Sequence, residues 1–335
     1  MLPYFKPILQ FISVDRVRVD SNISRLHYLV TGLVLVGYSI LLTSKVVVSD
    51  SIVCHSWYKS ENAPSERTLN SLCFTSSSDI TTSHHETTTS HYEETTTSHT
   101  PTIPIYYQYQ ALVFFLMAFG FYAPKFMYDM IEGGITEKVV QQLSEPILEQ
   151  SEREKQLKQL SLYIKRHFGN HHILAFCYFL TDLMYLMNLI IQAMVLNKVF
   201  SGFMTYGIEV NTSMVFPKSA VCLYSDESME HKIKATCMLP LNYLSDKFCL
   251  VLYWWFMVLG ISTCCLILHH IFFICSTMYR NHVLCLKGGK YWKKNEINRI
   301  FQGLNKSEVI SEAVFLQMII QNLSCDTALE LLNLL

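Results

Sequence analysis

Four cysteines lie in two polar segments between long apolar stretches, and these four are the residues best suited to covalent chemistry. They are Cys54 and Cys73 in residues 49–105, and Cys222 and Cys237 in residues 197–247. The orientation derived below places both segments outside the cell, where oxidising conditions favour disulfides. Four cysteines allow three connectivities, and their spacing selects none of them. Pairing between the segments would hold them as one surface, whereas pairing within each would leave two independent hairpins.

Other reactive residues do not form a catalytic or metal-binding pattern. The sequence has no paired carboxylates, nucleophile motif or glycine-rich phosphate loop, so we do not expect an enzyme. His269 and His270 lack a third ligand, and no cysteine and histidine array has zinc spacing. Further histidines in a Thr-rich stretch are irregularly spaced: His84, His85, His91 and His99. We therefore expect no metal and no cofactor, and the net charge of −1 gives no reason to expect a nucleic-acid partner.

Four apolar stretches must position the cysteine-bearing segments, because each is long enough to cross a bilayer as a helix. Half of the 335 residues are hydrophobic and 16% are charged, against about 25% charged in an ordinary soluble domain. We therefore expect an all-α polytopic membrane protein, with a cytoplasmic helical domain and disulfide-linked extracellular loops. The expected membrane-spanning helices are residues 26–48, 106–128, 173–196 and 248–276.

The distribution of Lys and Arg predicts the orientation of these helices. Residues 1–25, 129–172 and 277–335 hold 17 of these residues, against 7 in residues 49–105 and 197–247. The positive-inside rule then places both termini and the middle loop in the cytoplasm. The middle loop and the C-terminal tail are expected to be helical, and the N-terminus lacks the pattern of a cleaved signal peptide.

The second span differs at its two ends. Tyr106 and Tyr107 are expected to anchor it at the outer interface, with apolar rings and wet tips. Lys125 is expected to extend toward the inner interface, and Pro124 to kink the helix nearby. In the third span, Asp182 is expected to serve packing and interhelical hydrogen bonds more than pore lining.

Several stretches resemble the innexins, the invertebrate gap-junction channel subunits. The second span begins Tyr106-Tyr107-Gln108-Tyr109-Gln110, which is similar to the innexin pattern Tyr-Tyr-Gln-Trp-Val. The following FYAPKFMYDMIEGG, which contains Pro124, resembles the family's aromatic residue, proline, basic residue and Glu-Gly-Gly. The entry into the first span and the CMLPLNYLSDKF approach to the fourth are also similar to the family. The resemblance covers about residues 8–280.

Other features depart from the family pattern, as in a divergent member or a virus-carried innexin-like relative. Tyr109 and Gln110 replace Trp and Val, and Val-Ser-Asp-Ser at residues 48–51 stands where Gly-Asp-Pro is usual. Residues 75–100 form a Thr- and His-rich insert that is expected to be disordered. Asn211 begins the only N-glycosylation sequon in an outer loop. Both features add bulk where the channels of two cells would meet, which leaves docking open.

The resemblance implies a large-pore channel subunit of the plasma membrane. About eight innexin-like subunits, identical or mixed, would surround a central axis as a hemichannel in the lipid bilayer. Each hemichannel would dock with an opposing one on a neighbouring cell at a gap junction, and the channel would pass ions and small metabolites. The resemblance also implies that Cys54 pairs with Cys237 and Cys73 with Cys222.

The first residues of the chain are the expected pore constriction. By the same resemblance, residues 1–25 fold into the cytoplasmic mouth as a funnel. An apolar lining there would select by size and gate by dewetting. The residues concerned are Leu2, Pro3, Tyr4 and Phe5. The alternative for this segment is an amphipathic helix on the bilayer surface.

Two other functions remain open from the sequence. One is a non-junctional hemichannel, which would release small molecules without docking and is favoured by the Thr- and His-rich insert. The other is a four-span adhesion or scaffold protein without a pore.

Overall fold

The computed structural model describes residues 20–48, 51–56, 65–75, 104–140, 150–200, 202–203, 215–225, 232–287 and 294–335. These residues form two compact units. The terminal unit comprises the described residues within 20–32, 120–189 and 259–335, and the loop unit comprises those within 33–119 and 190–258. The helices of the four spans contribute residues to both units.

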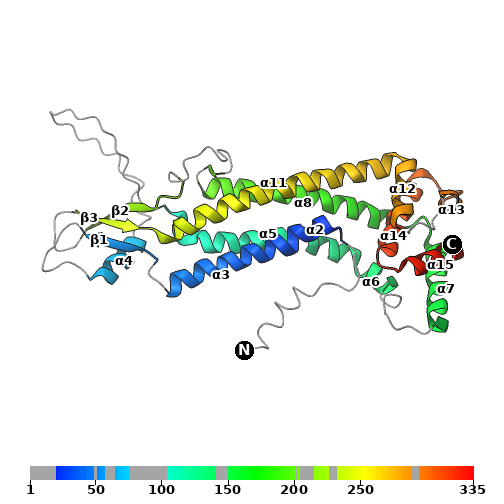
Figure 1. Ribbon diagram of the computed structural model, residues 1–335, viewed down its shortest axis with the longest axis horizontal. Coiled ribbons are helices and arrows are strands. Elements are labelled where there is room, and N and C mark those ends of the chain that lie inside the picture. The colour runs from blue at the N-terminus through cyan, green and yellow to red at the C-terminus, as the bar shows by residue number, and fades with distance from the viewer. Residues whose placement is uncertain are drawn as a thin grey trace. The chain divides into compact units, whose positions relative to one another are not determined.

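Four helical segments are long and apolar enough to cross a membrane, which confirms the all-α four-span class (Figure 1). They are Asn22–Val48, α5 (Tyr106–Glu132), α8 (His172–Val199) and α11 (Pro240–Cys275). Helix α11 begins at Pro240, eight residues before residue 248, where the sequence predicted the start of the fourth span. Pro240 suits the first helical position, because the backbone N–H that proline lacks would have no partner within the helix there and its φ is already helical. Two polar side chains of the first turns of α11, Asn242 and Ser245, are fully buried.

The first span contains a π-helical turn. It consists of α2 (Asn22–Arg25), η1 (Leu26–Thr31) and α3 (Gly32–Val48). The Thr31 hydroxyl donates to the carbonyl of Leu26, five residues earlier, at 2.8 Å. Such turns often occur at functional sites, and this one contains the buried His27, whose Nε2 lies 2.7 Å from Thr263 Oγ1 of α11.

The loop unit contains a small sheet that the sequence analysis did not predict. Strands β1 (Val53–Ser56), β3 (Lys232–Met238) and β2 (Ser219–Ser225) lie in the order β1-β3-β2, and both pairs are antiparallel (Figure 1). Helix α4 (Glu66–Thr75) contacts β1 and β2. We call β1, β2, β3 and α4 the loop platform.

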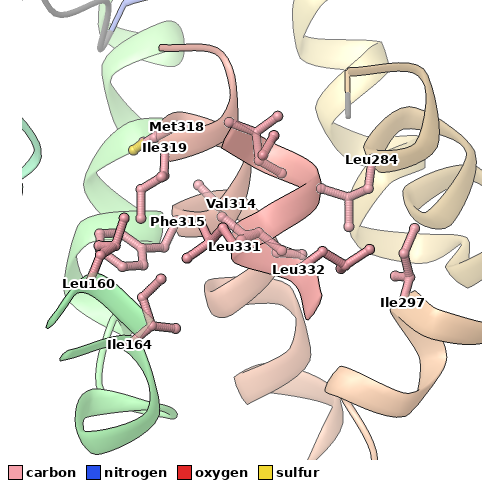
Figure 2. Packing of buried hydrophobic residues seen from close by; sticks show 14 of the residues in the cluster. Leu160, Ile164, Leu284, Ile297, Val314, Phe315, Met318, Ile319, Leu331 and Leu332 are labelled. Atoms are coloured by element: carbon pink, nitrogen blue, oxygen red, sulfur yellow. The ribbon is translucent and has the colours of Figure 1, made fainter. Parts of the chain in front are cut away.

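The terminal unit contains short helices packed around an apolar core. They are α6 (Ile135–Val140), α7 (Gln150–His167), α12 (Thr277–Lys287), α13 (Lys294–Ile300), α14 (Lys306–Ile320) and α15 (Cys325–Leu334). Figure 2 shows Ile164 of α7, Leu284 of α12, Ile297 of α13, Phe315 of α14 and Leu331 of α15 directed toward one another. The middle loop and the tail are thus helical where the structure describes them, as expected from the sequence.

The Glu-Gly-Gly sequence after the second span ends α5 and starts α6. Gly133 and Gly134 have φ values of 62° and 70°, a left-handed conformation that favours glycine at a helix end. The buried Glu132 carboxylate accepts hydrogen bonds from the amides of Gly134 at 2.7 Å and Thr136 at 2.5 Å. The carboxylate therefore satisfies amides of the first turn of α6 that have no partner within the helix.

Candidate functional site

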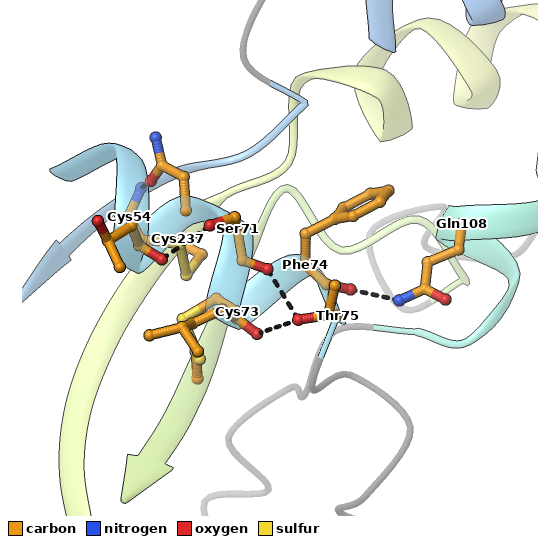
Figure 3. The surroundings of a disulfide bond; sticks show 11 residues. Cys54, Ser71, Cys73, Phe74, Thr75, Gln108 and Cys237 are labelled. Atoms are coloured by element: carbon orange, nitrogen blue, oxygen red, sulfur yellow. Dashed lines mark hydrogen bonds between the residues drawn. A yellow bond between two sulfur atoms is a disulfide. The ribbon is translucent and has the colours of Figure 1, made fainter. Parts of the chain in front are cut away.

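Two disulfides connect the two polar loops across the loop platform. Cys54 of β1 is bonded to Cys237 of β3, and Cys73 of α4 is bonded to Cys222 of β2. Figure 3 shows the first of these bonds beside Cys73. Both join one loop to the other, which is the pairing that the family resemblance implies. All four cysteines are buried. Because both disulfides connect the first loop to the second, the two loops form one cross-linked surface.

The close sulfur atoms of this region do not form a metal site. The Sγ atoms of Cys54, Cys73 and Cys237 lie within 4.8 Å of one another. A metal would require thiolates, and all three cysteines are held in disulfides. The cluster is therefore a structural cross-link.

Tyr107, at the start of α5, connects the platform to the spans. Its hydroxyl donates to the carbonyl of Ser51 at 2.6 Å and accepts from the amide of Leu241 at 3.3 Å. One side chain therefore ties the first loop to both α5 and the start of α11. Tyr107 is 1% exposed and Tyr106 is 9% exposed. The expected wet tips were wrong, because both side chains are buried and their hydroxyls bond to backbone groups of the loops and of α11, whereas their position at the outer interface stays a prediction.

Tyr106 and Gln108 connect α5 to two further points of the loops. The Tyr106 hydroxyl donates to the carbonyl of Val215 at 2.6 Å, which lies in the second loop. The Gln108 amide donates to the carbonyl of Phe74 in α4, next to the disulfide of Cys73 (Figure 3). The three residues of the Tyr-Tyr-Gln motif thus reach three different loop positions, and this explains why the motif contains two hydroxyls and an amide.

A second polar network connects three spans beneath the platform. Ser245 of α11 donates to Gln110 Oε1 at 2.7 Å, and its Oγ lies 3.0 Å from the hydroxyl of Tyr38 in α3. The Tyr38 ring stacks on Phe248 with a centroid distance of 3.5 Å. Gln110 is one of the departures from the family pattern, and the sequence analysis did not predict its partners. Its position in an apolar span was the only signal, because isolated polar groups in spans usually face a partner.

Replacing Tyr107 with phenylalanine is expected to lower the free energy of unfolding by about 1–3 kcal/mol, since the buried amide of Leu241 would lose its acceptor and the part-buried carbonyl of Ser51 its donor. The neighbouring Tyr109 is 54% exposed and provides the matched control. Tyr109→Phe is expected to change the unfolding free energy by less than about 0.5 kcal/mol. Thermal unfolding of the purified proteins in detergent measures both effects, and equal shifts would contradict the role given to Tyr107.

Lys125 lies in a buried ion-pair cluster of the terminal unit. Its Nζ is 3.0 Å from Asp20 Oδ2 and 2.6 Å from Asp129 Oδ1, and its side chain is 8% exposed. The Lys125 side chain is therefore held by two carboxylates and does not extend freely into solvent, whereas its place at the inner interface stays a prediction. Helix α5 continues through Pro124 to Glu132, although the proline provides no donor for the carbonyl one turn earlier.

Asp182 of α8 is also buried among polar groups in the terminal unit. Its Oδ2 lies 3.0 Å from His270 Nδ1 of α11, an ion-pair distance, although the alignment is not that of a hydrogen bond. Its Oδ1 accepts from Ser24 of α2 at 3.5 Å. The three helices are thus joined by polar contacts, in line with the structural role expected from the sequence. His270, one of the adjacent pair His269 and His270, thus lies beside the Asp182 carboxylate.

Several sequence-predicted site residues lie outside the described residues. They are the expected constriction Leu2, Pro3, Tyr4 and Phe5, the sequon at Asn211, and the Thr- and His-rich insert after Thr75. Their roles remain predictions.

Comparison with known proteins identifies the family. The innexin family model matches residues 20–335. The chain belongs to the innexin family. Among curated relatives, it is 25% identical over 311 residues to innexin shaking-B of Drosophila melanogaster, covering 86% of this chain and 82% of the relative. It is also 25% identical over 334 residues to innexin inx2 of the same species, covering 91% of this chain and 88% of the relative.

Membership gives this innexin its general function, that of a multi-pass membrane protein and gap-junction channel subunit. A third relative, innexin inx2 of Schistocerca americana, is 24% identical over 287 residues, covering 78% of this chain and 79% of the relative. In this innexin, the Tyr-Tyr-Gln motif attaches the loops to the spans, and the Glu-Gly-Gly motif shapes the turn from α5 into α6.

Proposed function

We propose that this innexin forms a large-pore hemichannel that docks with an opposing hemichannel of a neighbouring cell and passes ions and small metabolites. The observation that carries the proposal is the loop platform, in which both disulfides connect the first loop to the second. A surface that must fit a copy of itself needs a fixed shape, because disorder would add an entropic cost to docking. Cross-links between loops reduce that cost.

The platform faces the outside of the cell in this proposal, and both termini lie in the cytoplasm. Disulfides persist in oxidising surroundings, which supports an extracellular platform in the plasma membrane. The 17 Lys and Arg residues of the termini and middle loop, against 7 in the other two loops, support the same orientation.

The spans support assembly of several subunits in lipid. In the most apolar part of α11, only 22% of the residues are buried within the chain. Large side chains such as Val251, Trp254 and Ile261 are exposed there. These surfaces would contact lipid and neighbouring subunits, and about eight identical or mixed subunits would close into a ring around the pore. The first residues, Leu2 to Phe5, would narrow its cytoplasmic mouth.

Imaging of the purified assembly tests the ring. We expect a closed ring with an open axis in electron micrographs of the detergent-purified protein. A single subunit, or a ring filled along its axis, would contradict the proposal.

The second candidate is a hemichannel that releases small molecules without docking. The Thr- and His-rich insert and the sequon at Asn211 favour it, since both add bulk to the outer loops. Uptake of a small dye by single cells, without electrical coupling between paired cells, would select this function. Absence of both signals at normal surface delivery would favour a scaffold without a pore.

A further inference from the structure

A cavity of about 380 Å³ lies in the terminal unit, between α12, α13 and the start of α14. Its size falls within the range of small-molecule sites, about 300–1,000 Å³. Among the described residues, those that line it include no Asp or Glu. The polar part of the lining consists of Thr277, Arg280, Asn281, Asn298 and Lys306.

Arg280 is the central charge of this cavity. It is 2% exposed, and within the described part of the chain no carboxylate lies within ion-pair distance of it. Its Nη1 donates to the carbonyl of Phe273 at 3.4 Å and its Nη2 to Thr277 Oγ1 at 3.3 Å, both long for hydrogen bonds to a guanidinium. The Nε atom is buried and has no partner. A buried charge without a counter-ion is costly, so an anion at this site would stabilise the guanidinium.

The surroundings of Arg280 add further positive potential. Thr277 is the first residue of α12 and Lys306 the first residue of α14, so two helix N-termini meet at the cavity. The α14 terminus is already capped by Asn305 and the Glu308 carboxylate, and Ser276 Oγ accepts from the Tyr279 amide of α12, so Lys306 and Asn298 are the stronger additions to Arg280. Helix N-termini carry partial positive charge and commonly bind phosphate. Asn281 donates to Asn298 Oδ1 at 2.7 Å, which leaves the Asn298 amide nitrogen as an additional donor. Burial also lowers the pKa of Arg280, as expected for a guanidinium without a compensating anion.

The remaining wall of the cavity is apolar. Phe301, Leu304 and Val309 line it. A ligand for this site therefore combines an oxyanion that accepts several hydrogen bonds with an organic body. A free carboxylate would use fewer of the available donors than a phosphate does.

We propose that this cavity binds a phosphate monoester, with Arg280 as its main ligand and Lys306 as a second charge. The phosphate accepts from the guanidinium, and the organic body lies against Phe301. The same chemistry occurs in a soluble nucleotide and in a phosphoinositide headgroup. The alternative role of Arg280 is structural, as a donor to the carbonyl of Phe273. That role requires no ligand, so a binding measurement distinguishes it from the proposed role in ligand binding.

Binding to the full-length protein in phosphatidylcholine nanodiscs tests the proposal. One probe is AMP, measured by calorimetry, and the other is a phosphatidylinositol phosphate incorporated in the nanodisc, measured by crosslinking of a labelled form. We expect saturable binding of at least one probe. AMP binding would identify a soluble ligand, and binding of the lipid alone would identify a headgroup.

Variants assign the binding to this cavity. Arg280→Gln is expected to weaken binding of the probe by about 10- to 100-fold, the effect of losing a charged hydrogen-bonding partner. Arg299→Gln, at an exposed arginine of α13 that does not line the cavity, is the control and is expected to bind like the unmodified protein. Lys306 is exposed, so Lys306→Gln is expected to fold and provides the test if Arg280→Gln does not fold. It is expected to weaken binding of the probe several-fold.

Two results would overturn the proposal. One is the absence of saturable binding of either probe to the unmodified protein. The other is unchanged affinity in Lys306→Gln together with an Arg280→Gln variant that either binds normally or does not fold. Neither result concerns coupling between cells, so the outcome is independent of the proposed channel function.

Discussion

Replacing Cys73 and Cys222 together with serine is expected to abolish electrical coupling between paired cells while the protein still reaches the cell surface. This disulfide connects α4 to β2 across a sequence separation of 149 residues. The loop-entropy relation gives at most about 5 kcal/mol for a cross-link of this length. Its loss removes the covalent tie between α4 and β2 and leaves α4 held by non-covalent contacts alone, so the loop platform presents a less fixed surface.

Exposed free cysteines provide the matched control. Cys264 and Cys265 of α11 have no disulfide partner and are exposed. Cys264→Ser and Cys265→Ser are expected to couple normally, since neither changes the platform. Normal coupling of the Cys73→Ser, Cys222→Ser double variant would show that docking does not require the cross-link.

Lys125→Gln is expected to lower the free energy of unfolding by about 3–5 kcal/mol. The substitution leaves the carboxylate of Asp20, whose side chain is 9% exposed, without the cation 3.0 Å away. Breaking one partner of a buried ion pair has this magnitude because the remaining charge is uncompensated. Thermal unfolding in detergent, or the amount of protein at the cell surface, measures the loss.

The exposed pair of Lys155 and Glu152 in α7 is the control for Lys125. These side chains are 66% and 54% exposed, and their charged atoms are 3.8 Å apart. Lys155→Gln is expected to change the unfolding free energy by less than about 1 kcal/mol, as for other solvent-exposed pairs. A similar loss in both variants would mean that the cluster around Lys125 contributes no more than a surface pair.

The spans were predictable from the sequence because their signal is local. About 20 consecutive apolar residues are sufficient to identify a spanning helix. The start of the fourth span was less predictable. The first turns of α11 are polar, yet Asn242 and Ser245 are buried against partners in the loops and other spans. Hydropathy places such residues outside the helix, whereas tertiary contacts keep them within it.

The supports of the loop platform, and the ion pair of Lys125 in the terminal unit, were not predictable, because each depends on a residue distant in sequence. Tyr107 and Ser51 are 56 residues apart, and Lys125 and Asp20 are 105 residues apart. Tyr107 and Lys125 have the residue types of interface anchors, and only their partners show that they are buried. Strand β1 was missed because it has four residues and no long alternating pattern. Strands β2 and β3 have seven residues each, and the pairing of β3 with β1 depends on contacts between the two loops.

The central claim is that this innexin forms a channel that docks between cells, and dual voltage-clamp recording from cell pairs tests it most directly. We expect a junctional conductance when both cells express the chain, and none when only one does. Pairs in which both cells carry the protein at the surface, but which show no junctional conductance, would contradict the claim.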